Sequence, residues 1–210
     1  MLNIAVLISG GGTNLQAIID AVKQKEIDAK INLVISNRKN AYGLVRAKNE
    51  NINTLYLSRK SFKSNEEYDE VIIENLKAKN IDLVVLAGYL NILTEKFVKT
   101  YDKKIINIHP SLIPSFCGEG FYGENVHKAV INSGVKITGA TTHFVDENVD
   151  TGAIILQDFV LVDITDDYKS IAQKVLVKEH KLIVETVKAF CENRILFKDN
   201  KTFVVEDRDE

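Results

Sequence analysis

The chain has 210 residues, of which 45% are hydrophobic and 27% charged, and its formal net charge is -2 at pH 7. This composition is typical of one globular domain with a sizeable core, and the weak net charge argues against a nucleic-acid partner. The first apolar run ends at a glycine cluster and is too short for a membrane span or a signal peptide, so we expect a cytoplasmic protein that binds small molecules.

Short apolar runs alternate with segments of helical periodicity along the first half of the chain. Apolar runs of strand length lie at residues 3–8, 31–35, 54–57, 83–87 and 105–108. Helical spacing is expected from residue 13 or 14 onward and over residues 41–49, 65–79 and 94–100. Such alternation predicts parallel β-α-β units. We therefore expect an α/β fold with a Rossmann-like, doubly wound, mostly parallel sheet and helices on both faces.

The pattern changes after residue 107. Pro110 and Pro114, the only prolines, are followed by three glycines in a long loop, and long loops in compact domains tend to be functional. The elements expected beyond it are a helix over 124–132, strands over 136–145 and 152–162, a long helix capped by Thr165 or Asp166 and ending near Phe190, and a tail hairpin around Asp199 and Asn200. We expect a single domain over residues 1–210, with parts at 1–106, 107–193 and 194–210.

Three consecutive glycines, Gly10 to Gly12, join the first predicted strand to the first predicted helix. Backbone amides in such a turn, together with the positive end of the helix, can bind an anion. The pattern is not that of a dinucleotide site, because Leu15 stands where a third glycine belongs, and it lacks the Gly-Lys-Ser/Thr of an ATP-binding loop. Two interpretations stay open, a site for a single terminal phosphate and a tight turn without a ligand.

Asn107 and His109 stand two residues apart at the end of a predicted strand, so their side chains should share one face. A histidine can act as a general acid or base, and a carboxamide can donate a hydrogen bond to an oxygen that gains negative charge. Together they suit acyl transfer. The alternative is that Asn107 caps a turn and His109 belongs to the core, although Pro110 restricts the backbone of His109.

The acids in the loop after His143 have two interpretations: they are turn residues, or one of their carboxylates reaches His109, raises its pKa and holds its ring. Asp146, Glu147 and Asp150 all lie there, and periodicity does not choose among them. The four histidines and the two cysteines match no metal-ligand spacing, so we expect no metal.

Four motifs in order make the chain similar to the phosphoribosylglycinamide formyltransferase family, over nearly its whole length. They are ISGGGTNLQAIIDA (8–21), LAGYLNIL (86–93), NIHPSLIPSF (107–116) and GATTHFVDENVDTGAIILQ (139–157). The resemblance implies the formyltransferase fold. It also implies transfer of a formyl group from the co-substrate 10-formyltetrahydrofolate to the amine of phosphoribosylglycinamide, in purine (IMP) biosynthesis, by a monomer or homodimer.

The resemblance also implies roles for individual residues. The substrate would be bound by Gly12, Thr13, Asn14 and Glu179, the folate by Leu90, Asn91, Ile92, Leu93 and Asn107, and catalysis would rest on Asn107, His109 and Asp150. Asp150 is thereby selected as the carboxylate that raises the pKa of His109. Residues 1–106 become the phosphate-binding half, 107–193 the catalytic and folate-binding half, and 194–210 a short tail.

Several positions depart from the family pattern. Asn91 and Asn65 stand where basic residues often meet the folate tail, Leu176 replaces a polar residue, and the loop from Cys117 to Gly123 differs from the commoner version. The alternatives are another formyl-folate transferase, such as one acting on methionyl-tRNA, a formyltetrahydrofolate hydrolase, or a non-catalytic nucleotide-binding protein. The first two carry extra domains, and the third predicts that His109 is dispensable.

Overall fold

The computed structural model describes residues 1–199 and 201–206. Its strands are β1 (Leu2–Ile8), β2 (Ala29–Ser36), β3 (Thr54–Tyr56), β4 (Leu83–Leu86), β5 (Ile105–His109), β6 (Ile137–Phe144), β7 (Ile154–Leu161), β8 (Ile195–Lys198) and β9 (Lys201–Val204). Its helices are α1 (Thr13–Lys23), α2 (Tyr42–Asn49), α3 (Asn65–Ala78), α4 (Glu95–Thr100), α5 (Glu124–Ser133) and α6 (Tyr168–Cys191), with a short 3-10 turn at Arg59–Ser61.

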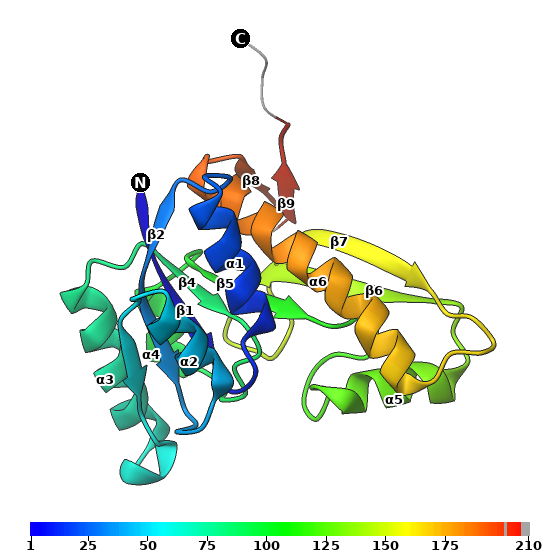
Figure 1. Cartoon of the computed structure of the whole chain (residues 1–210), viewed down its shortest axis with the longest axis horizontal. Helices are drawn as coiled ribbons and strands as arrows, with labels where there is room; N and C mark the ends of the chain where they lie inside the picture. The colour runs from blue at the N-terminus through cyan, green and yellow to red at the C-terminus, as the bar shows by residue number, and fades with distance from the viewer. Residues whose placement is uncertain (200, 207–210) are drawn as a thin grey trace.

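The central sheet has seven strands in the order β3-β2-β1-β4-β5-β6-β7. Strands β1 to β5 run parallel, whereas β6 and β7 join the edge as antiparallel strands (Figure 1). This arrangement confirms the predicted α/β class and the mostly parallel sheet. The order reverses direction between β1 and β4, and in open α/β sheets ligands bind at the carboxyl ends of the strands near such a reversal.

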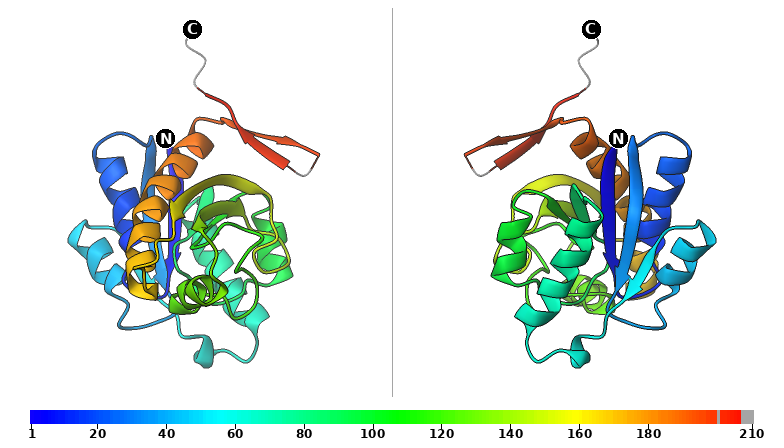
Figure 2. Two further views of the ribbon diagram at one scale, coloured as in Figure 1. Left: turned by 90° about the vertical axis from the view of Figure 1, so that its right-hand side faces the viewer. Right: turned by 90° about the vertical axis from the view of Figure 1, so that its left-hand side faces the viewer.

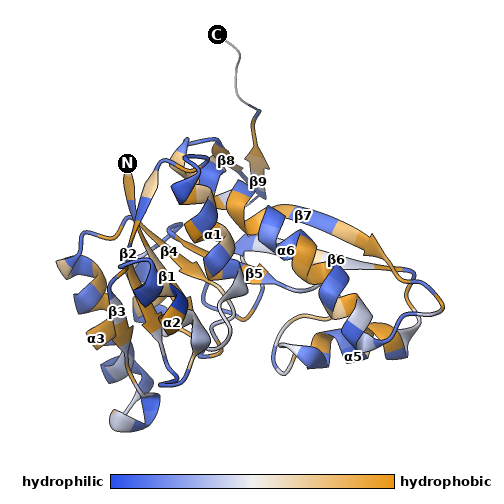
Figure 3. Cartoon of the chain, in the orientation of Figure 1, coloured by the Kyte–Doolittle hydropathy of each residue, from blue (hydrophilic) through white to orange (hydrophobic). Residues whose placement is uncertain are grey.

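Alternate side chains of β1 enter two separate cores, one on each face of the sheet. Ile4, Val6 and Ile8 pack into the core that α1, α2, α5 and α6 cover. Ala5 and Leu7 point the other way, into the core under α3 and α4. The buried parallel strands β1 and β4 are accordingly almost uniformly apolar, whereas the helices are apolar on one side only (Figure 3). The doubly wound arrangement is confirmed.

The predicted cap of the long helix is wrong by one or two residues. The N-cap is Asp167, whose carboxylate accepts hydrogen bonds from the amides of Lys169 and Ser170. Asp166 is instead paired with Lys174, with 2.6 Å between Oδ2 and Nζ. The capping box that Asp167 forms with Ser170 decides the register.

The tail forms the predicted hairpin, β8 and β9, which projects beyond the end of the central sheet (Figure 2). The sequence predicts its turn at Asp199 and Asn200, of which Asn200 lies outside the described residues. No helix within residues 1–199 and 201–206 is long and apolar enough to span a membrane.

Helix α6 is held in place by its buried face. Ile183 is fully buried, whereas Val177 on the same helix is 67% exposed. Replacing Ile183→Ala leaves a cavity and should lower the free energy of unfolding by about 2–5 kcal/mol. Val177→Ala removes a similar apolar group from the surface and should change it by about 0.5 kcal/mol or less. Chemical denaturation measures both; equal effects would show that α6 does not pack as described.

Candidate active site

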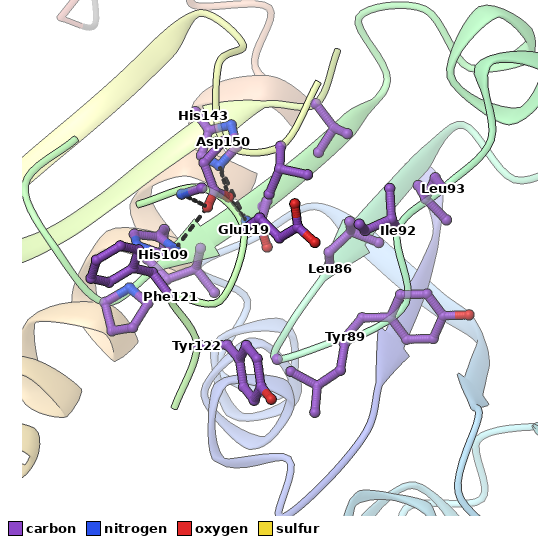
Figure 4. Close-up of a pocket in the computed structure, with 18 of the residues that line it drawn as sticks. Leu86, Tyr89, Ile92, Leu93, His109, Glu119, Phe121, Tyr122, His143 and Asp150 are labelled. Carbon is purple, nitrogen blue, oxygen red and sulfur yellow. Dashed lines mark hydrogen bonds and ion pairs between the residues drawn. The ribbon is translucent and has the colours of Figure 1, made fainter. Parts of the chain in front are cut away.

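A cavity of about 420 Å³ opens at the carboxyl ends of β4 and β5. Figure 4 shows the polar group of His109, His143 and Asp150 on one side and the apolar group of Leu86, Tyr89, Ile92 and Leu93 on the other. Asn107, Asn14 and Glu179 also line the cavity. The fold therefore brings together predicted residues from five separate segments of the chain.

The carboxylate of Asp150 lies at the centre of the polar group, and its side chain is 10% exposed. Oδ2 accepts a hydrogen bond from the amide of Gly118 at 3.0 Å and lies 3.5 Å from Nδ1 of His109. Oδ1 lies 3.5 Å from Nδ2 of Asn107 and 3.6 Å from Nε2 of His143. Of the three acids that the sequence left open, Asp150 is therefore the one beside His109.

Asp150 reaches this position because the β6–β7 loop is tightly closed. Its own φ is +58°, in the left-handed region that aspartate tolerates better than most residues. At Gly152 an added Cβ would lie 1.8 Å from the carbonyl oxygen of Phe144, so only glycine allows the loop to close there. Asp146 bonds Thr151 and the amide of Asn148 within the loop.

His143 fixes the orientation of the Asn107 carboxamide. The two residues are cross-strand partners in β5 and β6, with 3.1 Å between Nδ2 of Asn107 and Nε2 of His143. Nδ1 of His143 lies 2.7 Å from the carbonyl oxygen of Phe144, to which it can only donate. Nε2 thus faces both the Asn107 carboxamide and, at 3.6 Å, the Asp150 carboxylate.

Both ring nitrogens of His109 face protein groups. Nε2 donates to the carbonyl oxygen of Phe116 at 2.9 Å, and Nδ1 faces Asp150. The segment after His109 is itself anchored, since the amide of Ile113 donates to Oγ1 of Thr141 at 3.1 Å. The position of the ring is therefore fixed from both sides.

Burial and charge act on these groups in opposite directions. Burial lowers the pKa of His109 below its ordinary value, while the Asp150 carboxylate and the Phe116 carbonyl oppose that shift. Asp150 thus raises the pKa of His109, as predicted, but burial outweighs this effect and the net shift is downward. Burial alone would raise the pKa of Asp150, but the contact with His143 and the charge of His109 outweigh it and lower that pKa.

The glycine loop forms the start of α1, and Gly12 is its N-cap with φ +70°. An added Cβ at Gly12 would lie 2.6 Å from the Cα of Gly43, so close packing against α2 explains this glycine without any ligand. Gly10 and Gly11 have open space in the direction of a Cβ, so packing does not explain them. Within the described residues no side chain caps the first turn of α1, which leaves its amides available to an anion.

Asn14 and Glu179 meet across α1 and α6. Nδ2 of Asn14 donates to Oε2 of Glu179 at 2.7 Å, whereas its Oδ1 is buried with no hydrogen-bond partner in the part of the chain that the structure describes. Burial raises the pKa of Glu179, and the contact with Asn14 opposes that shift. An unpaired acceptor beside a buried carboxyl is suited to a ligand that carries hydroxyl or amine groups.

The predicted folate segment follows β4 and forms the apolar side of the cavity. Ile92 is 63% exposed and Leu90 41% exposed, although both are large and apolar, whereas Leu93 is buried. Oδ1 of Asn91 accepts a hydrogen bond from Nδ2 of Asn37 at 2.7 Å. Exposed apolar side chains at a cavity wall are typical of a ligand-binding surface.

The sequence analysis missed three contributors to the site. His143, His127 and the backbone of Gly118 all line the cavity; His143 lies within the segment 139–157, but no role was assigned to it. The register of β5 against β6 was the one signal for His143, since it stands opposite Asn107. Among the described residues, no group of three or more histidine, cysteine, aspartate or glutamate side chains is arranged to hold a metal ion.

Comparisons with known proteins agree with this geometry. A family model described as formyl transferase matches residues 2–187. The phosphoribosylglycinamide formyltransferase of Haemophilus influenzae is 44% identical over 204 residues, which cover 97% of this chain and 94% of that protein. The crystal structure of glycinamide ribonucleotide transformylase 1 from Symbiobacterium toebii superposes with a TM-score of 0.93 at 36% identity, covering 98% and 95% of the two chains.

A second kind of enzyme shares the fold. The formyltetrahydrofolate deformylase of Pseudomonas syringae pv. tomato has a TM-score of 0.88 at 28% identity, and the match covers 98% of this chain but 66% of the deformylase.

The contact between Asp150 and His109 predicts how the pKa of His109 changes when the carboxylate is removed. Because the carboxylate opposes the downward shift, Asp150→Asn should lower the pKa of His109 further below its ordinary value. NMR titration of the imidazole signals measures this change. Asp146→Asn removes the same charge from the same loop and should leave the His109 titration nearly unchanged, since that carboxylate bonds Thr151. A His109 pKa that stays constant or rises in Asp150→Asn would refute the coupling.

Proposed function

The chain belongs to the formyl transferase family, and we propose that it transfers the formyl group of 10-formyltetrahydrofolate to the amine of phosphoribosylglycinamide. The observation that carries this proposal is the cluster of Asn107, His109 and Asp150 at one cavity wall, opposite an apolar wall. The product is the N-formylglycinamide ribonucleotide of purine biosynthesis. The chain is 44% identical to the Haemophilus influenzae formyltransferase and 28% identical to the deformylase, which favours transfer over hydrolysis.

The two substrates are assigned to opposite ends of the cavity. The first-turn amides of α1, from Gly12, Thr13 and Asn14, bind the phosphate, and Glu179 with Asn14 faces the ribose or glycinamide. Leu90, Asn91, Ile92 and Leu93 line the folate end. The reacting carbon then lies beside Asn107 and His109, between the two ends.

Asn107 and His109 stabilise the charge that develops on the formyl oxygen. One N–H of Asn107 faces His143 at 3.1 Å. The other faces Asp150 at 3.5 Å, which is long for a hydrogen bond, so Asn107 can exchange this weak contact for one with the substrate oxygen. His109 carries a positive charge when protonated, and Phe116 and Asp150 then accept from both ring nitrogens. No covalent bond to the protein is needed, because the amine attacks the formyl carbon directly.

The remaining assignments belong to the same proposal. The protein is cytoplasmic, its partners are small molecules rather than nucleic acid or a membrane, and it is a monomer or homodimer that needs no metal. It forms a single domain with parts at 1–106, 107–193 and 194–210. Within these parts the cavity draws Leu90 to Leu93 from the first and His109 and Asp150 from the second. Folate binding is therefore shared between the two larger parts.

The activity is tested by mixing the purified protein with 10-formyltetrahydrofolate and phosphoribosylglycinamide and following the deformylated folate by absorbance. We expect loss of the formyl group only when the amine substrate is present, with one formylated product per folate consumed. Formyl loss that is independent of the amine would identify a hydrolase, and no loss in either case would show that phosphoribosylglycinamide is not its substrate.

Two substitutions test the assigned roles. Asn107→Ala removes one donor to the developing oxyanion and should lower kcat about 10²–10³-fold. His109→Ala should lower it about 10²–10⁴-fold. Thermal unfolding should show that both variants stay folded, and Ser133→Ala, on the far end of α5, serves as the control. A variant with kcat near that of the wild type would remove that residue from the mechanism.

A further inference from the structure

His127 is a buried imidazole in the wall of the cavity that the mechanism above does not use. It lies in the first part of α5, is 6% exposed, and lines the cavity together with His109 and Glu179. Its Nδ1 is buried and has no hydrogen-bond partner within residues 1–199 and 201–206. Buried polar groups nearly always have a partner, so an unpaired nitrogen at the wall of a substrate cavity indicates a contact that a ligand completes.

Helix α5, which carries His127, packs against α6. Val130, three residues along α5, packs in the same core as Val175 of α6. Helix α6 also carries Glu179, which meets Asn14 at the end of the cavity assigned to phosphoribosylglycinamide. His127 also lies close enough to His109 for that ring to affect its pKa, so it belongs to the polar part of the cavity wall.

The amine must lose a proton before it can attack. An α-amino group has a pKa of about 7.7–8.0, so most of it is an ammonium ion without a lone pair at pH 7. The cavity favours this cationic form further, because Glu119, Asp150 and Glu179 line it. A group in the wall that accepts this proton would therefore raise the rate at neutral pH.

The catalytic groups already described are poorly placed to accept it. Nε2 of His109 faces the carbonyl oxygen of Phe116 and Nδ1 faces Asp150, so neither nitrogen is free to receive a proton from a ligand. Asp150 accepts from Gly118 and also faces Asn107, His109 and His143, so its oxygens already have partners within the protein.

His127 has the charge state that a base requires. Burial lowers its pKa, the nearby His109 lowers it further, and Glu124 on its own helix acts in the opposite direction. The other charged groups at this wall are Glu179 from α6 and Glu119 from the loop before α5. The ring is therefore neutral at pH 7 and carries a lone pair.

We propose that His127 is the general base that takes the proton from the substrate ammonium, an inference that rests on the proposed function. The N–H bond of the ammonium breaks, and a ring nitrogen of His127 binds the proton. The freed lone pair forms the bond to the formyl carbon, and a second amine proton passes to the folate nitrogen as its bond to that carbon breaks. His127 then releases its proton to water.

The pH dependence of kcat/KM for phosphoribosylglycinamide tests this role in His127→Gln. Without the base, only the neutral amine reacts, so the variant should fall about tenfold below the wild type at pH 7 and about a hundredfold at pH 6. Above about pH 9, where the amine is neutral by itself, its activity should approach that of the wild type. Lys128→Gln, an exposed neighbour on the same helix, should follow the wild-type profile throughout.

Other outcomes overturn the proposal. A loss in His127→Gln that is the same at every pH would indicate a packing or hydrogen-bonding role, and no loss would exclude any role. If kcat/KM recovers at high pH in Glu179→Gln and not in His127→Gln, the Glu179 carboxyl group is the base. His127→Asn is the second variant if the first does not fold. An inactive wild type would refute the proposed function, and this inference with it, whereas an active wild type with a flat His127→Gln profile refutes only the inference.

Discussion

A carboxylate removed from water needs partners, and the site is organised around how Asp150 obtains them. Its oxygens lie within 3.6 Å of the Gly118 amide and of the Asn107, His109 and His143 side chains. These partners come from β5, from β6 and from the loop before α5. Because an unpaired buried charge is costly, each of these segments is constrained by the same group. The carboxylate thereby couples the strand that carries the catalytic pair to the loop that covers it.

The sheet supplies the geometry that this coupling requires. Antiparallel β6 places His143 opposite Asn107, and the close approach at Gly152 returns the chain so that Asp150 faces both strands. Parallel β4 and β5 direct their carboxyl ends into the same cavity, where apolar residues on one side face polar residues on the other. A cavity divided in this way suits one substrate with an extended ring system and another with charged and hydroxyl groups.

Local sequence patterns predicted most of the fold because the apolar runs and helical stripes are long. The strands near residues 3–8 and 105–108 and the helix over 65–79 agree with the structure to within one or two residues. The cap of α6 was misplaced because Thr165, Asp166 and Asp167 are all capable N-caps, and only the reciprocal bond with Ser170 selects Asp167. Propensity alone does not distinguish adjacent caps.

The site was only partly predictable. Asn107 and His109 follow from their spacing at the end of a strand, but the choice of Asp150 over Asp146 required the family resemblance, because it depends on a left-handed φ and a tight turn that have no periodic signal. The effect of Asp150 in raising the pKa of His109 was predicted, but the net downward shift was not, because it depends on burial, which spacing does not measure. His127 was passed over because a single histidine on a helix has no motif.

The central claim is that Asp150 acts through the residues it holds rather than as an independent catalytic group. A double-mutant cycle on kcat, with His109→Ala, Asp150→Asn and the double variant, tests it most directly. If the carboxylate works by positioning and charging His109, the double variant should be no slower than about the slower single variant. Losses that multiply in the double variant would contradict the account, because they would show that Asp150 contributes to the reaction independently of the histidine.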